Sequence, residues 1–433
     1  YYGAGGEVLG IKLPGERTVR MNTYEYPESR RLFDRACTVI PGGIYGHFNA
    51  VPLSRAEAFP LYASRAEGAR FWDVDGNEFI DYMCAYGPMI LGYANLVVDE
   101  AFRKQVQQAD TVSVASPKMI ELAEMLVDRV AIADWAFFAK NGADVTSYAV
   151  TIARAATGRN KIIAIKGGYH GTHPWMQAPG HHGIMPDDHK HFIRIDWNDY
   201  DALEKVVAEH GDDIAGFISS PCHHPTFQDN ALPADGYWEK VEALLRKNGI
   251  VFIIDDVRCG FRLHRGGSNE RYGFTPDLIC FCKALANGYP ISALAGTEAL
   301  RTVTANVFHT GSYWYSAGPM AAAIATLEEL DRLDAPRLLD EIGTRLNDGL
   351  LRIANSHGYT LKITGEPSMA YYRITDDPST ILHQRWNAEC TRRGAYVTPY
   401  HNWFVSTAHT DADLERTWAI ADEAFAAIKK EGM

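Results

Sequence analysis

One lysine, Lys283, lies between a short apolar run and a glycine turn in the stretch FCKALANGYP, residues 281–290. The residues before it, from Asp277 to Cys282, are predicted to form a strand buried on both faces, so Lys283 would lie where a sheet ends. Such a lysine can simply extend its ammonium group into water. It can also be a partly desolvated amine that acts as a nucleophile and forms a Schiff base. The other motifs of the chain must decide between these two interpretations.

A pair of acids follows another apolar run in the stretch IVFIIDDVRCGFR, where Ile250 to Ile254 lead into Asp255 and Asp256. Open α/β sheets bind ligands at the carboxyl ends of their strands. A carboxylate there can hold a protonated ring nitrogen, as a pyridoxal phosphate (PLP) enzyme requires if its cofactor is to accept electrons. The alternative, which we favour for Asp256 alone, is a solvated acid in a loop.

Two glycine-containing stretches could hold the rest of such a cofactor. The turn NGAD, residues 141–144, lies between a predicted strand and a predicted helix, where free N–H groups and the helix dipole can bind a phosphate. In KGGYHG, residues 166–171, Tyr169 could cover a flat ring. Each motif is weak by itself, since a glycine can serve only the backbone and a tyrosine can simply pack on the surface.

The elements that must position these residues alternate along the chain. Strands are predicted at 136–140, 214–221 and 250–256, and helices at 116–130 and 237–249. This alternation predicts an α/β fold with a mostly parallel central sheet and helices on both faces. We expect a large ligand-binding domain over residues 68–318. Residues 1–67 and 319–433 should form an N-terminal segment plus a smaller α+β domain, with helices at 319–333 and from about Asp411 to Lys430.

Taken in order, the phosphate turn, the aromatic residue, the acid and the lysine form a recognisable series. The sequence resembles the fold-type I PLP enzymes of the class III aminotransferases, most closely the group that includes glutamate-1-semialdehyde aminomutase. The matching stretches are ARFWDVDGNEFIDY, GPMILGYA, TGRNKIIAIKGGYHG, DDVRCGFR, TPDLICFCKALANGYPISALAG and TGSYWYSAGPMAAA. The resemblance covers nearly the whole chain, and it implies a PLP-dependent aminotransferase that moves an amino group between an amine and a carbonyl acceptor through a Lys283 aldimine.

The resemblance also implies roles for single residues. Lys283 matches the Schiff-base lysine and Asp255 the partner of the pyridinium nitrogen. Val257 and Tyr169 match the residues on the two faces of the cofactor ring. Ser312, in TGSYW, matches a threonine that reaches the phosphate of the neighbouring subunit, so a homodimer is implied.

Gly142 and Ala143 match the phosphate turn of the family. The family usually has a hydroxyl where Ala143 stands, so one phosphate hydrogen bond is expected to be missing.

The substrate-facing positions depart from the aminomutase. Asn49 stands where that enzyme has a substrate-binding arginine, and Ser220 where class III enzymes commonly have a glutamate. We therefore favour an aminotransferase, with the 1,2-aminomutase and a PLP-dependent racemase or epimerase as alternatives. Tyr45, His401 and Asn402 are further candidate substrate contacts. Together they predict a pocket for an uncharged or hydroxylated amine or carbonyl compound, unless an arginine elsewhere, such as Arg258 or Arg262, binds a carboxylate.

Composition narrows the class of protein. The chain of 433 residues has 46% hydrophobic and 22% charged residues and a formal charge of -12, without long runs of one sign. We therefore expect no nucleic-acid partner and, since no stretch approaches the ~20 apolar residues of a membrane span, no membrane partner. Seven scattered cysteines and no recognisable signal peptide predict a cytoplasmic protein.

Two rival functions remain on the sequence alone. The stretch HHGIMPDDHKH, residues 181–191, concentrates histidines and aspartates as a metal-dependent hydrolase would require, but it lacks the H-E-x-x-H spacing, and we expect no metal. A non-catalytic binding protein of the same fold is the other rival, and the presence of both Lys283 and Asp255 argues against it.

Overall fold

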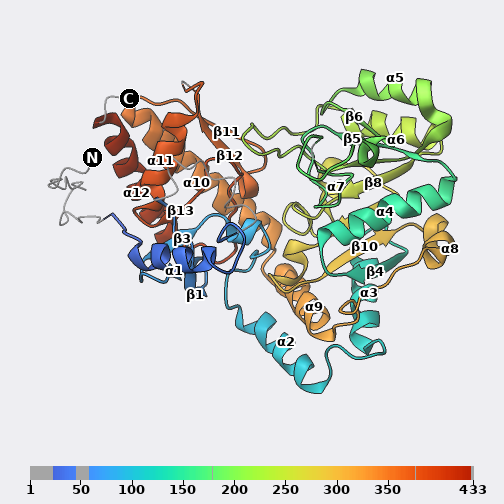
Figure 1. Ribbon diagram of the computed structural model, residues 1–433, viewed down its shortest axis with the longest axis horizontal. Coiled ribbons are helices and arrows are strands. Elements are labelled where there is room, and N and C mark those ends of the chain that lie inside the picture. The colour runs from blue at the N-terminus through green and yellow to red at the C-terminus, as the bar shows by residue number, and fades with distance from the viewer. Residues whose placement is uncertain (1–22, 45–57, 178, 376, 431–433) are drawn as a thin grey trace.

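The computed structural model describes residues 23–44, 58–177, 179–375 and 377–430, which form two lobes. In Figure 1 one lobe contains the central sheet and the green and yellow middle of the chain. The other lobe brings the blue N-terminal segments beside the red C-terminal helices.

The central sheet has seven strands in the order β4-β10-β9-β8-β7-β5-β6. β10 pairs antiparallel with both β4 and β9, whereas the pairs from β9 to β6 are parallel. Six strands therefore run in one direction, with β10 reversed among them, and their carboxyl ends lie along one edge of the sheet. The strands are β4 (Trp135–Ala139), β5 (Lys161–Ile165), β6 (Phe192–Ile195), β7 (Ile214–Ser219), β8 (Val251–Asp255), β9 (Leu278–Phe281) and β10 (Ser292–Gly296).

Helices cover both faces of this sheet, which explains why its strands are apolar at nearly every position. In β5, Ile162 and Ala164 belong to one apolar cluster with the helix α4, and Ile163 and Ile165 belong to the large cluster on the opposite face. The fold is thus the fold-type I α/β architecture that the sequence predicts. The helices of this lobe are α3 (Pro117–Arg129), α4 (Gly142–Thr157), α5 (Tyr200–His210), α6 (Tyr237–Lys247), α7 (Ser268–Tyr272) and α8 (Glu298–Asn306).

The other lobe contains a four-stranded sheet in the order β1-β2-β3-β13 and the two-stranded sheet β11-β12. The expected domain boundary at residue 68 falls between the hydrogen-bonded strands β1 and β2, so we propose that the smaller domain also includes β2 and β3. Its strands are β1 (Ala63–Glu67), β2 (Arg70–Asp73), β3 (Glu78–Asp81), β11 (Leu361–Thr364), β12 (Tyr371–Ile374) and β13 (Ala395–Tyr396). The remaining helices are α1 (Pro27–Cys37), α2 (Leu96–Gln108), α9 (Ala317–Arg332), α10 (Ala335–His357), α11 (Ile381–Thr391) and α12 (Asp411–Lys430).

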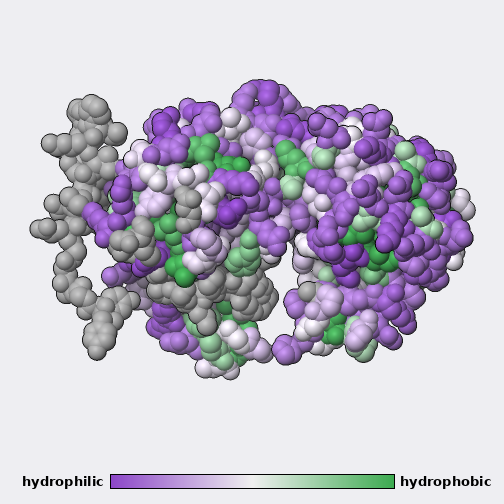
Figure 2. Space-filling model, turned by 90° about the horizontal axis from the view of Figure 1, so that it is seen from above, coloured by the Kyte–Doolittle hydropathy of each residue, from purple (hydrophilic) through white to green (hydrophobic). Residues whose placement is uncertain are grey.

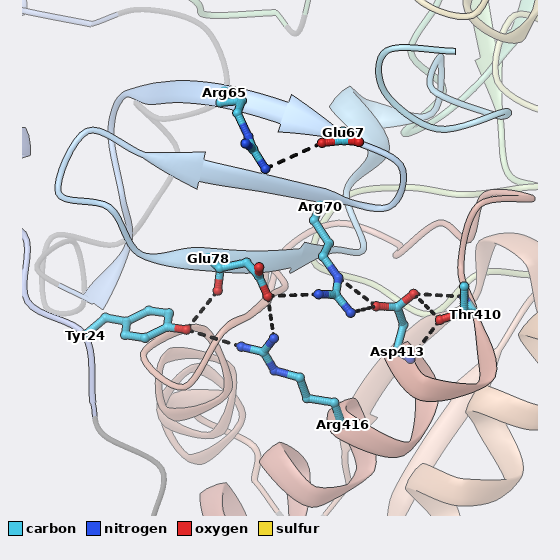
Figure 3. A network of polar contacts seen from close by, with 8 residues as sticks. All are labelled: Tyr24, Arg65, Glu67, Arg70, Glu78, Thr410, Asp413 and Arg416. Carbon is cyan, nitrogen blue, oxygen red and sulfur yellow. Dashed lines mark hydrogen bonds and ion pairs between the residues drawn. The ribbon is translucent and has the colours of Figure 1, made fainter. Parts of the chain in front are cut away.

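A polar network joins the N-terminal strands to the last helix (Figure 3). Arg70 on β2 donates to the Asp413 carboxylate at 2.7 Å and to Glu78 on β3 at 3.0 Å. Arg416, one turn further along α12, also contacts Glu78. These half-buried ion pairs explain how residues separated by more than 300 positions hold one lobe together.

The face of the molecule seen from above is largely polar. Figure 2 shows a mostly purple face, with apolar side chains in separate small patches. Among the residues that the structure describes, none of the helices is both long and apolar enough to cross a bilayer.

Candidate active site

A cavity of about 520 Å³ opens where the central strands end, and it contains most of the residues singled out from the sequence. Their elements explain this convergence, because β4, β7, β8 and β9 are parallel and end at the same edge of the sheet. The candidate residues that line the cavity are Gly142, Ala143, Tyr169, Ser220, Asp255, Val257 and Lys283.

Lys283 follows the end of β9 and begins the short helix η6 (Lys283–Ala286). Its backbone φ is +43°, a left-handed conformation that is uncommon for a residue with a side chain. Its Nζ donates a hydrogen bond to the backbone oxygen of Tyr86 at 2.9 Å. Burial, reinforced by the positive charge of Arg258, lowers the pKa of Lys283 to about 7. A large fraction of this amine is therefore neutral and nucleophilic near neutral pH.

The segment that receives Lys283 is itself strained. Cys84, Ala85 and Tyr86 have φ values of +45°, +51° and +66°, so three successive residues with side chains are left-handed. Such conformations persist only where the surrounding structure enforces them, and they concentrate at functional sites.

Asp255 ends β8 and is held by two hydrogen bonds. Its Oδ1 accepts from the backbone N–H of Val257 at 3.1 Å, and its Oδ2 lies 2.6 Å from Nδ1 of His170. Both side chains of the His170–Asp255 pair are nearly fully buried. The carboxylate is thus fixed in orientation at the cavity wall. The sequence analysis did not single out His170, although it directly follows Tyr169 in the motif KGGYHG.

The N-terminus of α4 forms another wall, and its backbone can approach a ligand closely. A Cβ atom on Gly142 would lie 3.0 Å from Cγ1 of Val257, and one on Gly171 would lie 2.5 Å from Cβ of Ala143. At both glycines the neighbouring residues pack too closely to leave room for a side chain. Free N–H groups and the positive end of this 16-residue helix suit a phosphate group.

The remaining expected contacts lie elsewhere. Ser312 is exposed on the surface and does not line this cavity. His401 and Asn402 are each 1% exposed and do not line the cavity. Tyr45 and Asn49 fall outside the described residues. Arg258, named from the sequence only as a possible carboxylate ligand, does line the cavity.

The residues present fit PLP. They provide an amine for the aldehyde, a fixed carboxylate suited to a ring nitrogen, and a helix N-terminus for the phosphate. In the part of the chain that the structure describes, no group of three or more His, Cys, Asp or Glu side chains is placed to hold a metal ion.

Comparisons with known proteins identify the family of this chain. A sequence model of the family Aminotransferase class-III matches residues 53–416. An aminopentol aminotransferase of Sphingopyxis macrogoltabida is 42% identical over 92% of this chain and 94% of that protein. A glutamate-1-semialdehyde 2,1-aminomutase of Methanosphaera stadtmanae is 30% identical over 90% of this chain and 96% of that protein.

A solved structure shows the same fold. The PLP internal aldimine form of the FumI protein of Sphingopyxis sp. MTA144 has a TM-score of 0.90 and 41% sequence identity, and the match covers 93% of this chain and 97% of that one. The family, the fold, the aminotransferase activity and the cofactor expected from the sequence are thereby confirmed. The chain belongs to the class-III aminotransferases, and it is a PLP-dependent enzyme of fold type I.

Proposed function

We propose that this aminotransferase takes the amino group from an uncharged or hydroxylated amine, with Lys283 and Asp255 as its catalytic residues. The observation that carries the assignment of these two residues is their convergence on one cavity, with the amine of Lys283 shifted towards its neutral form and Asp255 fixed by His170. In the net reaction the amino group moves from the donor to the carbonyl carbon of the acceptor. The donor carbon becomes a carbonyl carbon in return.

Each residue has a defined task in this proposal. Bound PLP supplies an electron sink for the carbanion that forms at the substrate carbon bearing the nitrogen. The Nζ of Lys283 would remove the proton from that carbon and deliver a proton to the cofactor carbon that keeps the nitrogen. Asp255 holds the ring nitrogen in its protonated form. Gly142 and Ala143 bind the phosphate through their N–H groups, and Val257 and Tyr169 enclose the ring.

The preference for a neutral or hydroxylated amine rests on the cavity lining. Ser220 and His224 place neutral polar groups in the wall near Lys283. The relative from Sphingopyxis macrogoltabida supports the same preference, because the name aminopentol denotes an amine with several hydroxyl groups. The aminomutase remains the second candidate, since a relative with that activity aligns along most of the chain.

We also propose a homodimer in which Ser312 contacts the cofactor phosphate of the neighbouring subunit. Ser312 is exposed, and so are three aromatic residues close to it in sequence, Phe308, Tyr313 and Tyr315, at 83%, 67% and 47%. Large exposed apolar side chains in one segment are typical of an interaction surface. The free cysteines support the further proposal of a cytoplasmic location.

A half-reaction screen tests the function. The PLP form is mixed with a panel of donors, and loss of its visible absorbance band is followed. We expect neutral amines and amino polyols to react faster than dicarboxylic amino acids, and fastest reaction of glutamate-1-semialdehyde or its diamino relative would restore the aminomutase.

Lys283→Ala should lack the lysine-linked absorbance band and turnover, and a retained band would refute its role. Asp255→Asn should keep the cofactor bound, but its rate should fall by several powers of ten. Each tenfold fall corresponds to about 1.4 kcal/mol of activation free energy.

A further inference from the structure

One nitrogen in the cavity wall has no partner within the described part of the protein. His224 lines the same cavity as Lys283 and Asp255, and its Nε2 is buried and makes no hydrogen bond to the described residues. The residue is held in place, because Nη1 of Arg258 donates to its backbone oxygen at 3.1 Å. A buried polar atom without a partner is unfavourable. Nε2 of His224 is therefore suited to a polar group of a molecule that enters the cavity.

The ring of His224 is neutral and lies within electrostatic range of the Lys283 amine. Burial, reinforced by the positive charge of Arg258, holds the pKa of His224 well below its usual range. The charge of Lys283 also acts to lower this pKa, so the two side chains are near one another. The amine of a donor must reach the position of the Lys283 amine in order to react. A donor group that binds Nε2 of His224 is therefore close to the carbon that carries the amine.

A hydroxyl group suits this nitrogen. In a neutral imidazole one ring nitrogen donates and the other accepts, and a hydroxyl does both, so it pairs with Nε2 in either tautomer. An ammonium group only donates and a carboxylate only accepts, so each pairs with one tautomer alone. The nearby guanidinium of Arg258 also disfavours a second cation. Ser220, another polar residue of this cavity, is neutral as well.

A buried water is the competing partner for this nitrogen. A second cavity of about 10 Å³, room for about one water, is lined by residues that include His170, Ser220 and His224. Among the described residues Nε2 of His170 also has no hydrogen-bond partner. One water between the two rings would satisfy both nitrogens and leave neither for a substrate. The two explanations differ in whether a hydroxyl on the donor changes the rate.

We propose that Nε2 of His224 hydrogen-bonds a hydroxyl group on the carbon next to the amine-bearing carbon of the donor, so that the donor is a vicinal amino alcohol. This inference rests on the proposed function, and it adds the chemical class of the donor and the residue that selects it. His224 is then a specificity-determining residue that moves no proton in the reaction. Its bond to the hydroxyl positions the amine-bearing carbon beside Nζ of Lys283.

The test compares three amine donors in the half-reaction of the PLP form. The donor sec-butylamine has no hydroxyl, 3-amino-2-butanol has one on the carbon next to the amine-bearing carbon, and 4-amino-1-pentanol has one two carbons further along. Loss of the visible absorbance band gives a second-order rate constant for each donor. For the wild type we expect the rate constant for 3-amino-2-butanol to be about 10- to 100-fold higher than for the other two. Similar rate constants for 3-amino-2-butanol and 4-amino-1-pentanol would overturn the proposal, and this comparison needs no variant.

Two variants assign the preference to His224. His224→Phe keeps a flat ring without its nitrogens, whereas His224→Gln supplies an amide that can donate or accept. The preference for 3-amino-2-butanol over sec-butylamine should fall at least about tenfold in His224→Phe and should be largely retained in His224→Gln. Equal losses for the two donors would assign Nε2 to the bridging water or to a structural role. Weaker retention of PLP by His224→Phe during dialysis would assign Nε2 to the cofactor.

Either of these two results would overturn the proposal. A wild type that converts dicarboxylic amino acids but none of the three amines would instead refute the proposed function, so the two failures are distinguishable.

Discussion

Replacing His170 with phenylalanine removes the shortest contact of Asp255 while nearly preserving the shape of the side chain. Asp255 is 5% exposed and His170 is 2% exposed, so no bulk water replaces the lost partner. The carboxylate keeps only the bond from the N–H of Val257 at 3.1 Å. A hydrogen bond to a charged group contributes about 1.5–3 kcal/mol, and the free energy of unfolding should fall by about that amount.

The same loss should appear in catalysis. Without His170 the carboxylate is less firmly oriented, so it stabilises a protonated ring nitrogen less well. If the transition state loses the whole free energy of the His170–Asp255 hydrogen bond, kcat falls about 10- to 100-fold. Each tenfold fall corresponds to about 1.4 kcal/mol of activation free energy. The assay is single-turnover conversion of the PLP form by a saturating amine, together with denaturant unfolding.

His170→Gln is the matched control, because its amide can still donate to Asp255. It should retain more rate and more stability than His170→Phe. Equal losses in the two variants would show that ring shape matters and the hydrogen bond does not. A rate within about twofold of the wild type in His170→Phe would refute the reasoning, since that corresponds to less than about 0.5 kcal/mol.

Two other predictions follow from the charges around the site. With the pKa of Lys283 lowered to about 7, only its neutral amine attacks an aldehyde, so capture of pyridoxal by the cofactor-free protein should speed up between about pH 6 and 8 and then level off. Stopped-flow absorbance measures this, and a rate still rising above pH 9 would contradict it. Arg262→Leu leaves the buried oxygens of Gly87 and Val405 without a donor, whereas the oxygen of Ser368 keeps the N–H of Val405. Each unsatisfied oxygen costs about 1–3 kcal/mol. Chemical denaturation should show a loss of more than about 2 kcal/mol, and a loss below about 1 kcal/mol would contradict it.

Local sequence patterns predicted much of the fold because those patterns reflect local physics. The helix expected at 116–130 is α3, from Pro117 to Arg129, and the hydroxyl of its N-cap Ser116 accepts the N–H of Lys118. The last helix, α12, runs from Asp411 to Lys430 as expected. The reversed direction of β10 was not predicted, because an apolar run has the same pattern in either orientation.

The presence of Asp255 and Lys283 in one cavity could be anticipated because a residue type at a strand end is informative by itself. Asp255 and Lys283 directly follow apolar runs, and parallel pairing brings those ends together. The role of His170 depends on a contact across 85 positions, which no local pattern encodes. Arg258 and Arg262 have the same chemistry and are four residues apart, so only their packing separates a cavity residue from a buried one.

The reversed strand β10 affects how firmly the nucleophile is held. Lys283 lies on a short connection between β9 and β10, which are hydrogen-bonded neighbours inside the sheet, with β8 and β4 on their outer sides. Every residue of β9 and β10 is buried. Opening this connection therefore requires disrupting two interior strands of the sheet, and buried interior strands exchange their amide hydrogens most slowly. Lys283, the proposed nucleophile, is thus attached to a part of the protein that should open only in global unfolding, so local fluctuations of the cavity rim leave its position unchanged.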